Sequence, residues 1–147
     1  MRVLIACEES ATVRVAFEKE GHEAWSCDIE PSRVAGNHIQ ADVLSVLDDG
    51  WDLMIAHPPC TYLSKAGARW LYGSGKINQE RYELGMKAKE FFLKLLNSNI
   101  PMIAVENMGF AEGNAGNPAL RIWSSVFKAH LIMVEKLAAT CSNKQTQ

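Results

Sequence analysis

The segment from Trp51 to Thr61, WDLMIAHPPCT, constrains the fold more than any other part of the chain. Its apolar part, 52–56, is too short for a stable helix and runs into prolines, which favours a strand. Proline has a fixed φ and no amide hydrogen, and a residue that precedes a proline is driven out of the helical region. Residues 57–60 are therefore stiff and extended. They hold Cys60 beyond the carboxyl end of a strand, which is where open α/β sheets bind ligands, although most free cysteines are simply small buried hydrophobes.

Short apolar runs bounded by Gly, Pro or Asp recur along the chain. Besides 52–56, they predict strands at 2–6, 22–27, 38–41 and 102–105. One helix is expected after Ser10, as its N-cap, and before Gly21, with an apolar spacing formed by Val13, Ala16 and Phe17. A longer helix is expected from Asn78 to about Asn97, with a core stripe formed by Phe91, Phe92 and Leu95. This alternation predicts an α/β fold with a Rossmann-like, doubly wound, mostly parallel sheet.

An acidic residue follows each of the early predicted strands: Glu8 or Glu9, then Asp28, then Asp42. In a Rossmann-like sheet, an acid at the end of the second strand accepts hydrogen bonds from ribose hydroxyls. Carboxylates at such positions also solvate loops and cap helices, so each one alone is a weak signal. The first loop lacks the G-x-G-x-x-G pattern, which disfavours a pyrophosphate-bearing dinucleotide and ordinary oxidoreductase activity. A nucleoside ligand without phosphates does not need that glycine cradle.

The charge of the chain offers no general footprint for nucleic acid. Its 147 residues fit one domain and carry a formal net charge of −2, so DNA binding would need a local patch or a partner. One segment, 62–76, interleaves basic and aromatic side chains: Lys65, Arg69 and Lys76 with Tyr62, Trp70 and Tyr72. This mixture suits a single-stranded or flipped nucleotide, and it equally suits a solvated surface helix.

The cysteines and the apolar runs bear on metal, membrane and compartment. Cys7, Cys27, Cys60 and Cys141 are spaced too widely for a zinc pattern, so no metal site is expected. The first apolar run is too short for a signal peptide, and no run of 18 apolar residues predicts a membrane span. We therefore expect an intracellular, cytoplasmic protein with reduced thiols.

Composition changes after residue 107. Residues 1–107 carry eleven Lys and Arg against fifteen Asp and Glu, a formal −4, whereas 108–147 carry four against two, a formal +2. The stretch 108–118 is rich in Gly and Asn, an apolar stretch follows, and the tail CSNKQTQ is expected to be disordered. The predicted organisation is a core at 1–107 and a divergent or incomplete C-terminal segment at 108–147.

Several of these features together resemble a DNA cytosine-5 methyltransferase: Pro58-Pro59-Cys60, Glu106-Asn107, Asp28 and Asp42. The segments 1–28, 36–43 and 51–64 are similar to the short, phage- and prophage-encoded members of that family. The resemblance covers about the first three quarters of the chain. It implies a Rossmann-like sheet that binds S-adenosylmethionine, a flipped cytosine in DNA as substrate, and the cytoplasm of a bacterial host or phage-infected cell.

The resemblance also implies roles for individual residues. Cys60 matches the nucleophile that attacks carbon six of cytosine, and Glu106, next to Asn107, matches the acid that holds and protonates the ring at nitrogen three. Asp28 matches the residue on the cofactor ribose, and Asp42 the residue at the adenine amino group. The implied cofactor-binding residues are Ala6, Cys7, Glu8, Glu9, Ser10, Asp28, Ile29, Asp42, Val43 and Pro58. Cys60 and Glu106 are expected to lie within a few ångströms of each other, at the ends of adjacent strands.

The chain departs from the family in three places. The first loop is not glycine-rich, Met108 follows Glu106-Asn107 where a proline or a β-branched residue is usual, and no Gln-x-Arg-x-Arg or recognition domain follows. The last forty residues fit a divergent end, a frameshifted end or a truncation. A protein partner or a homodimer could supply a DNA-reading surface. Two alternatives stay open: a degenerate fold that acts in binding or interaction, and an amino-group methyltransferase with a variant Pro-Pro-aromatic motif.

Overall fold

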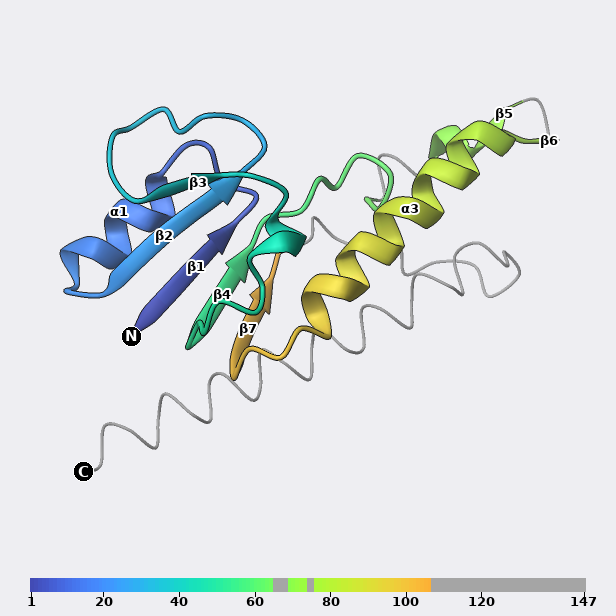
Figure 1. The fold of residues 1–147 in the computed structure, drawn as a ribbon. Coiled ribbons are helices and arrows are strands. Elements are labelled where there is room, and N and C mark those ends of the chain that lie inside the picture. The colour runs from blue at the N-terminus through green and yellow to red at the C-terminus, as the bar shows by residue number, and fades with distance from the viewer. Residues whose placement is uncertain (65–68, 74–75, 107–147) are drawn as a thin grey trace. The chain divides into compact units, whose positions relative to one another are not determined.

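The computed structural model describes residues 1–64, 69–73 and 76–106 (Figure 1). The elements are β1 (Arg2–Ala6), α1 (Thr12–Lys19), β2 (Glu23–Asp28), β3 (His38–Gln40), the 3₁₀ helix η1 (Val43–Ser45), β4 (Leu53–Ala56), the 3₁₀ helix η2 (Arg69–Leu71), β5 (Tyr72–Gly73), β6 (Lys76–Ile77), α3 (Gln79–Leu96) and β7 (Met102–Val105). Every strand expected in residues 1–106 is present, to within one or two residues at its ends. The additional short pair β5 and β6 was not predicted.

Among the described residues, five strands form one sheet in the order β3-β2-β1-β4-β7. All four pairings are parallel, and Ala6 of β1 lies opposite both Cys27 and Ala56, while Ala56 lies opposite Val105. The arrows in Figure 1 accordingly point the same way, and their carboxyl ends share one edge. This confirms the α/β fold with a parallel sheet. The central strands are buried on both faces, which is why β1 and β4 are continuous apolar runs rather than alternating ones.

The chain separates into two compact units. The first consists of residues 1–58 and 94–106 and contains the sheet and α1; the described part of the second lies within Pro59–Leu93. The predicted division into 1–107 and 108–147 stays a prediction, because residues 107–147 lie outside the described residues.

Helix α1 packs against β2 and β1, but not through the face that the sequence indicated. Arg14 is the buried residue of α1, while Ala16 is exposed and Val13 and Phe17 are half-buried. The expected apolar face is therefore wrong in part. A charged side chain can occupy the interior here because the guanidinium meets a carboxylate and two carbonyl oxygens, as described below.

In the second unit, Asn78 caps α3 as expected, since its Oδ1 accepts a hydrogen bond from the Arg81 amide at 3.0 Å. β5 and β6 pair in antiparallel fashion, with Gly73 opposite Lys76. Of the expected α3 stripe, Phe92 and Leu95 are buried and Phe91 is half-buried.

Candidate functional site

The predicted site residues of the first unit converge on the carboxyl edge of the sheet. Ala6 ends β1 and Asp28 ends β2, Pro58 follows β4, and Glu106 directly follows β7. Because the four strands are parallel neighbours, their ends lie along one edge in the order β2, β1, β4, β7. Such an edge is the usual ligand-binding side of an open α/β sheet.

The loop between β1 and α1 adopts a conformation that glycine favours, without containing glycine. Cys7 has φ 59° and Ala11 has φ 62°, both in the left-handed region. The amides of Cys7 and Glu8 both donate to the carbonyl of Cys27, at 2.8 and 3.3 Å. Left-handed backbone at ordinary residues costs on the order of 1 kcal/mol each, and it often marks functional loops. The sequence lacks the glycine-rich form, yet the backbone bends as such a loop does at these two positions.

The side chain of Glu8 caps the first turn of α1. Its side chain is buried, and its two oxygens accept the amides of Val13 at 2.6 Å and Arg14 at 3.2 Å. The expectation that Ser10 is the N-cap is wrong, because Ala11 takes that position in the left-handed conformation and Glu8 supplies the carboxylate. Ser10 contributes a weaker bond, from the Thr12 amide to its hydroxyl at 3.3 Å. Glu8 therefore shapes the loop and has no oxygen turned to solvent.

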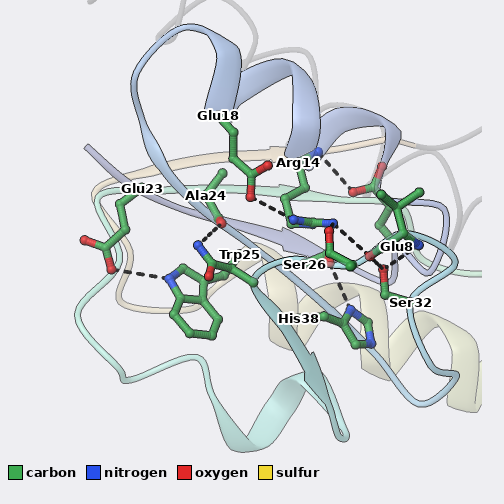
Figure 2. A network of polar contacts seen from close by, with 12 residues as sticks. Glu8, Arg14, Glu18, Glu23, Ala24, Trp25, Ser26, Ser32 and His38 are labelled. Atoms are coloured by element: carbon green, nitrogen blue, oxygen red, sulfur yellow. Dashed lines mark hydrogen bonds and ion pairs between the residues drawn. The ribbon is translucent and has the colours of Figure 1, made fainter.

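Buried and loop polar groups tie the β1–α1 loop to the segment after β2 (Figure 2). Arg14 pairs with Glu18 at 2.7 Å and donates to the carbonyls of Val34 and Ala35 at 3.1 and 3.2 Å. Glu9 forms an ion pair with Arg33, whose amide also donates to the Glu9 carbonyl. Figure 2 also shows Ser26 bonded to His38 of β3, at 2.9 Å. These contacts hold the loops over this half of the edge in fixed positions.

Asp28 and Asp42 each use one carboxylate oxygen to accept a hydrogen bond from a nearby backbone amide. Oδ1 of Asp28 accepts the Glu30 amide at 3.0 Å, and Oδ1 of Asp42 accepts the Leu44 amide at 3.0 Å as the N-cap of η1. Ile29, beside Asp28, is 71% exposed. Val43, beside Asp42, belongs to the core instead. An exposed apolar side chain beside a carboxylate can cover a planar ring while the acid accepts hydrogen bonds from its polar groups.

The thiols of Cys7 and Cys27 show that these acids share one neighbourhood. Burial, followed by the smaller effects of the charges of Asp28, Cys27 and Asp42, raises the pKa of Cys7 to about 12. Burial likewise raises the pKa of Cys27 to about 11, with Asp28 and Asp42 adding to the effect. Both carboxylates are therefore close enough to act on the same thiol. Cys7, expected beside the cofactor, is a neutral side chain at physiological pH.

The other half of the edge joins β4 to β7 through one polar contact. Nδ1 of His57 lies 2.7 Å from Oε2 of Glu106, with the His57 side chain 27% and the Glu106 side chain 63% exposed. The backbone fixes both residues, because the His57 amide donates to Ala6 and the Glu106 amide to Ala56. Sequence reasoning missed His57. Its signal was the position directly before Pro58, at the end of a buried strand.

Cys60 lies near the start of the second unit, directly after Pro59. Its carbonyl accepts the amides of Leu63 and Ser64 at 3.0 and 2.9 Å, so the thiol stands at the start of a helical turn. Arg81 of α3 lies over the Tyr62 ring, 5.1 Å from its centroid, and donates to the Thr61 carbonyl at 3.4 Å. The Arg81 guanidinium therefore stabilises the turn that follows Cys60. The short distance expected between Cys60 and Glu106 stays a prediction, and Asn107 lies outside the described residues.

Part of the basic and aromatic segment can be located. Trp70 is 60% exposed and Lys76 is exposed, while Lys65 lies outside the described residues. Within the described ranges, no group of three or more His, Cys, Asp or Glu side chains is arranged to hold a metal ion. No helix in that same part of the chain has the length and apolar character needed to cross a membrane.

Comparison with known proteins adds no identification: no protein-family model matches the chain, and no curated protein matches it.

Proposed function

We propose that this chain is an S-adenosylmethionine-dependent DNA cytosine-5 methyltransferase-like protein built on a Rossmann-like sheet. The observation that carries the proposal is the pairing of β4 with β7. β4 leads through His57 into Pro58-Pro59-Cys60, and β7 leads directly into Glu106. The chain segments that carry the proposed nucleophile and the proposed acid therefore leave neighbouring parallel strands of one sheet.

The β1–β3 part of the edge fits a nucleoside cofactor. Asp28 and Asp42 each keep one oxygen that does not serve the local backbone, Ile29 offers apolar surface, and the loop after Ala6 bends at Cys7 and Ala11. In the proposal, Asp28 accepts from the ribose hydroxyls and Asp42 from the adenine amino group. Glu8 keeps its capping role and shapes the loop. When bound, S-adenosylmethionine supplies an electrophilic methyl group.

The proposed chemistry uses two side chains. Carbon five of cytosine is a poor nucleophile, so the Cys60 thiolate first forms a bond to carbon six while Glu106 gives a proton to nitrogen three. The resulting enamine makes carbon five nucleophilic. After carbon five is methylated, it loses its proton to water, the Cys60 thiolate departs to restore the ring double bond, and the nitrogen-three proton returns to Glu106. The base must be flipped out of a duplex to reach such a pair.

Charge limits how well the chain alone can hold DNA. Affinity for DNA comes mainly from neutralised phosphates, and residues 1–107 carry a formal −4. Within residues 1–107 the Lys65–Lys76 segment is the visibly basic one, and the Arg-bearing motif of the family is missing. We therefore propose that the isolated chain binds cofactor but methylates DNA slowly or not at all, and that a partner or a second copy supplies further positive surface.

Titration calorimetry with S-adenosylmethionine tests the cofactor site. A lost hydrogen bond to a charged acceptor costs about 1.5–3 kcal/mol, so Asp28→Ala should weaken binding at least about tenfold. Asp49→Ala is the matched control: it removes the same charge at the opposite end of the sheet, where the Asp49 carbonyl accepts from Arg2. Equal affinity in wild type and Asp28→Ala would remove the assignment. No binding by the wild type would favour the interaction protein over the enzyme.

Transfer of labelled methyl groups to duplex and single-stranded DNA tests the chemistry, with Cys60→Ser as the blank. Label at carbon five of cytosine supports the proposal, whereas label on an exocyclic amino group would favour an amino-group methyltransferase. Rapid Cys60-dependent turnover by the chain alone would show that no partner is needed.

A further inference from the structure

The contact between His57 and Glu106 is short and specific. Nδ1 of the imidazole and Oε2 of the carboxylate are 2.7 Å apart, which is the length of a charge-assisted bond. The backbones of both residues continue the hydrogen-bond ladder of the sheet, so the two side chains start from fixed positions. Among the described residues, His57 is the side chain that contacts the Glu106 carboxylate.

The second nitrogen of His57 determines which atom donates. Nε2 is buried and has no hydrogen-bond partner among the residues that the structure describes. A buried N–H without an acceptor is rarer and more costly than a buried lone pair without a donor, so the proton belongs on Nδ1. Nδ1–H then donates to Oε2 of Glu106. An oxygen that already accepts this bond is the poorer place for a proton, so a protonated Glu106 carries its acidic proton on Oε1.

We infer that His57 is a positioning residue which holds Oε2 of Glu106 and reserves Oε1 as the oxygen that gives its proton to nitrogen three of cytosine. The inference rests on the proposed function. As the Cys60 Sγ–C6 bond forms and Oε1 loses its proton, Glu106 becomes a carboxylate. Nδ1–H strengthens its bond to that carboxylate and so stabilises the charge as it develops.

A merely structural role explains the contact less well. A hydrogen bond with one partner this exposed adds at most a small amount to stability, because water competes for the carboxylate. The imidazole costs the fold a buried nitrogen without a partner. A group that benefits the reaction rather than the fold accounts for both facts.

The rate of covalent trapping tests the inference even when turnover is slow. In an oligonucleotide with 5-fluorocytosine, carbon five can take the methyl group but carries fluorine instead of the departing proton, so the bond between Cys60 and carbon six persists. The full chain is incubated with S-adenosylmethionine and a single-stranded oligonucleotide of mixed sequence in which every cytosine is replaced by 5-fluorocytosine. Mass spectrometry then follows the adduct over time. Cys60→Ser and Glu106→Gln are the blanks.

Two substitutions of His57 separate the hydrogen bond from the bulk of the ring. We expect His57→Phe, which keeps a ring but has no donor, to slow adduct formation by about 10- to 100-fold, since it removes one bond to a charged group. His57→Gln, whose amide can still donate, should recover most of that loss. His57→Ala serves as a second donor-free variant if the Phe ring disturbs the fold. Calorimetry should give the same cofactor affinity for the His57 variants and the wild type.

The outcomes separate the two proposals. A His57→Phe variant that reacts at the wild-type rate, a His57→Gln variant as slow as His57→Phe, or loss of cofactor affinity in the His57 variants would overturn the positioning role and leave the proposed function standing. A wild type that binds cofactor yet forms no adduct, even at high oligonucleotide concentration where weak DNA binding no longer limits the reaction, would overturn the positioning role and favour the binding protein over the enzyme.

Discussion

The two halves of the carboxyl edge treat their carboxylates in opposite ways. On the β1–β3 half, Glu8 is buried and spends both oxygens on the amides that open α1. On the β4–β7 half, Glu106 is 63% exposed and is met by one imidazole. Glu8 lies two residues after β1, and Glu106 directly follows β7. The sequence analysis assigned both residues to the site. The difference teaches that a strand-end acid keeps an oxygen for a ligand only where the surrounding backbone does not use both of its oxygens.

The largest expected effect is on the alkylation rates of Cys7 and Cys27, the two thiols of the buried β1–β3 half. At pH 8, the reactive thiolate fraction of Cys7, with a pKa of about 12, is about one-thousandth of that of a thiol with the ordinary pKa of 9.0. For Cys27, with a pKa of about 11, the thiolate fraction is about one-hundredth of the ordinary value. We expect iodoacetamide to modify both residues slower by at least those factors in the folded chain than in guanidinium. Peptide mass spectrometry against time measures the rates site by site. Equal rates in the folded and unfolded chain would show that the β1–β3 half opens freely.

Removing each carboxylate should separate the halves in stability. Glu8→Ala leaves the amides of Val13 and Arg14 without their acceptor and should lower the free energy of unfolding by about 2–4 kcal/mol. Glu106→Ala, the matched control, should cost less than about 1 kcal/mol, because its pair with His57 is largely solvated. Urea unfolding followed by circular dichroism measures both. Similar losses of unfolding free energy for the two substitutions would show that the two halves do not differ in how they use their carboxylates.

Most of the fold follows from sequence patterns, because continuous apolar runs and turn residues determine the strands of a buried parallel sheet locally. β1 and β7 appear with the expected bounds. The errors arise where a side chain acts over a distance in the sequence. Arg14 is buried because carbonyls twenty and twenty-one positions away meet its guanidinium, and no local pattern shows this.

The candidate site was predictable to a smaller extent. Strand ends identify where Asp28, Asp42 and Glu106 lie, but not how many of their oxygens remain for a ligand. Glu8 was assigned to the cofactor because its capping depends on two left-handed residues that a sequence does not reveal. His57 was missed because its partner follows β7, far along the chain, and only the pairing of β4 with β7 brings them together.

Glycine positions give a finer test of how rigid the β1–β3 half is. Gly36 has φ 140°, and a Cβ there would lie 2.0 Å from Nη1 of the buried Arg14, so Gly36→Ala should cost about 2–4 kcal/mol. Gly21 has φ 80° with nothing within 4 Å of such a Cβ, so Gly21→Ala should cost about 1 kcal/mol. Thermal and urea unfolding compare the two. If Gly36→Ala is no worse than Gly21→Ala, the guanidinium is free to move aside.

Stability should also depend on alkaline pH, and near pH 9 this dependence is the smallest of the expected effects. The pKa values of Cys7 and Cys27 are raised in the folded state above 9.0, so the unfolded chain loses these protons first. The stability they contribute is complete below pH 9 and is lost as the pH rises towards 11 and 12. Urea midpoints between pH 8 and 10.5 should fall, and should fall less in a chain with both cysteines replaced by Ala. An equally steep fall in that variant would assign the effect to other groups.

The position of β7 has a consequence for how the chain assembles on the way to its native state. β1 to β4 are contiguous in the sequence and can associate early, whereas β7 pairs with β4 only after residues 59–101 have been made. Until then β4 is a bare apolar edge, open to pairing with other chains. Among the described residues, β7 is the last strand to enter the sheet, and it is also the strand that brings Glu106 to His57. A chain that stops before residue 102 would therefore expose the β4 edge to aggregation, and Glu106 can join the edge only once β7 has paired with β4.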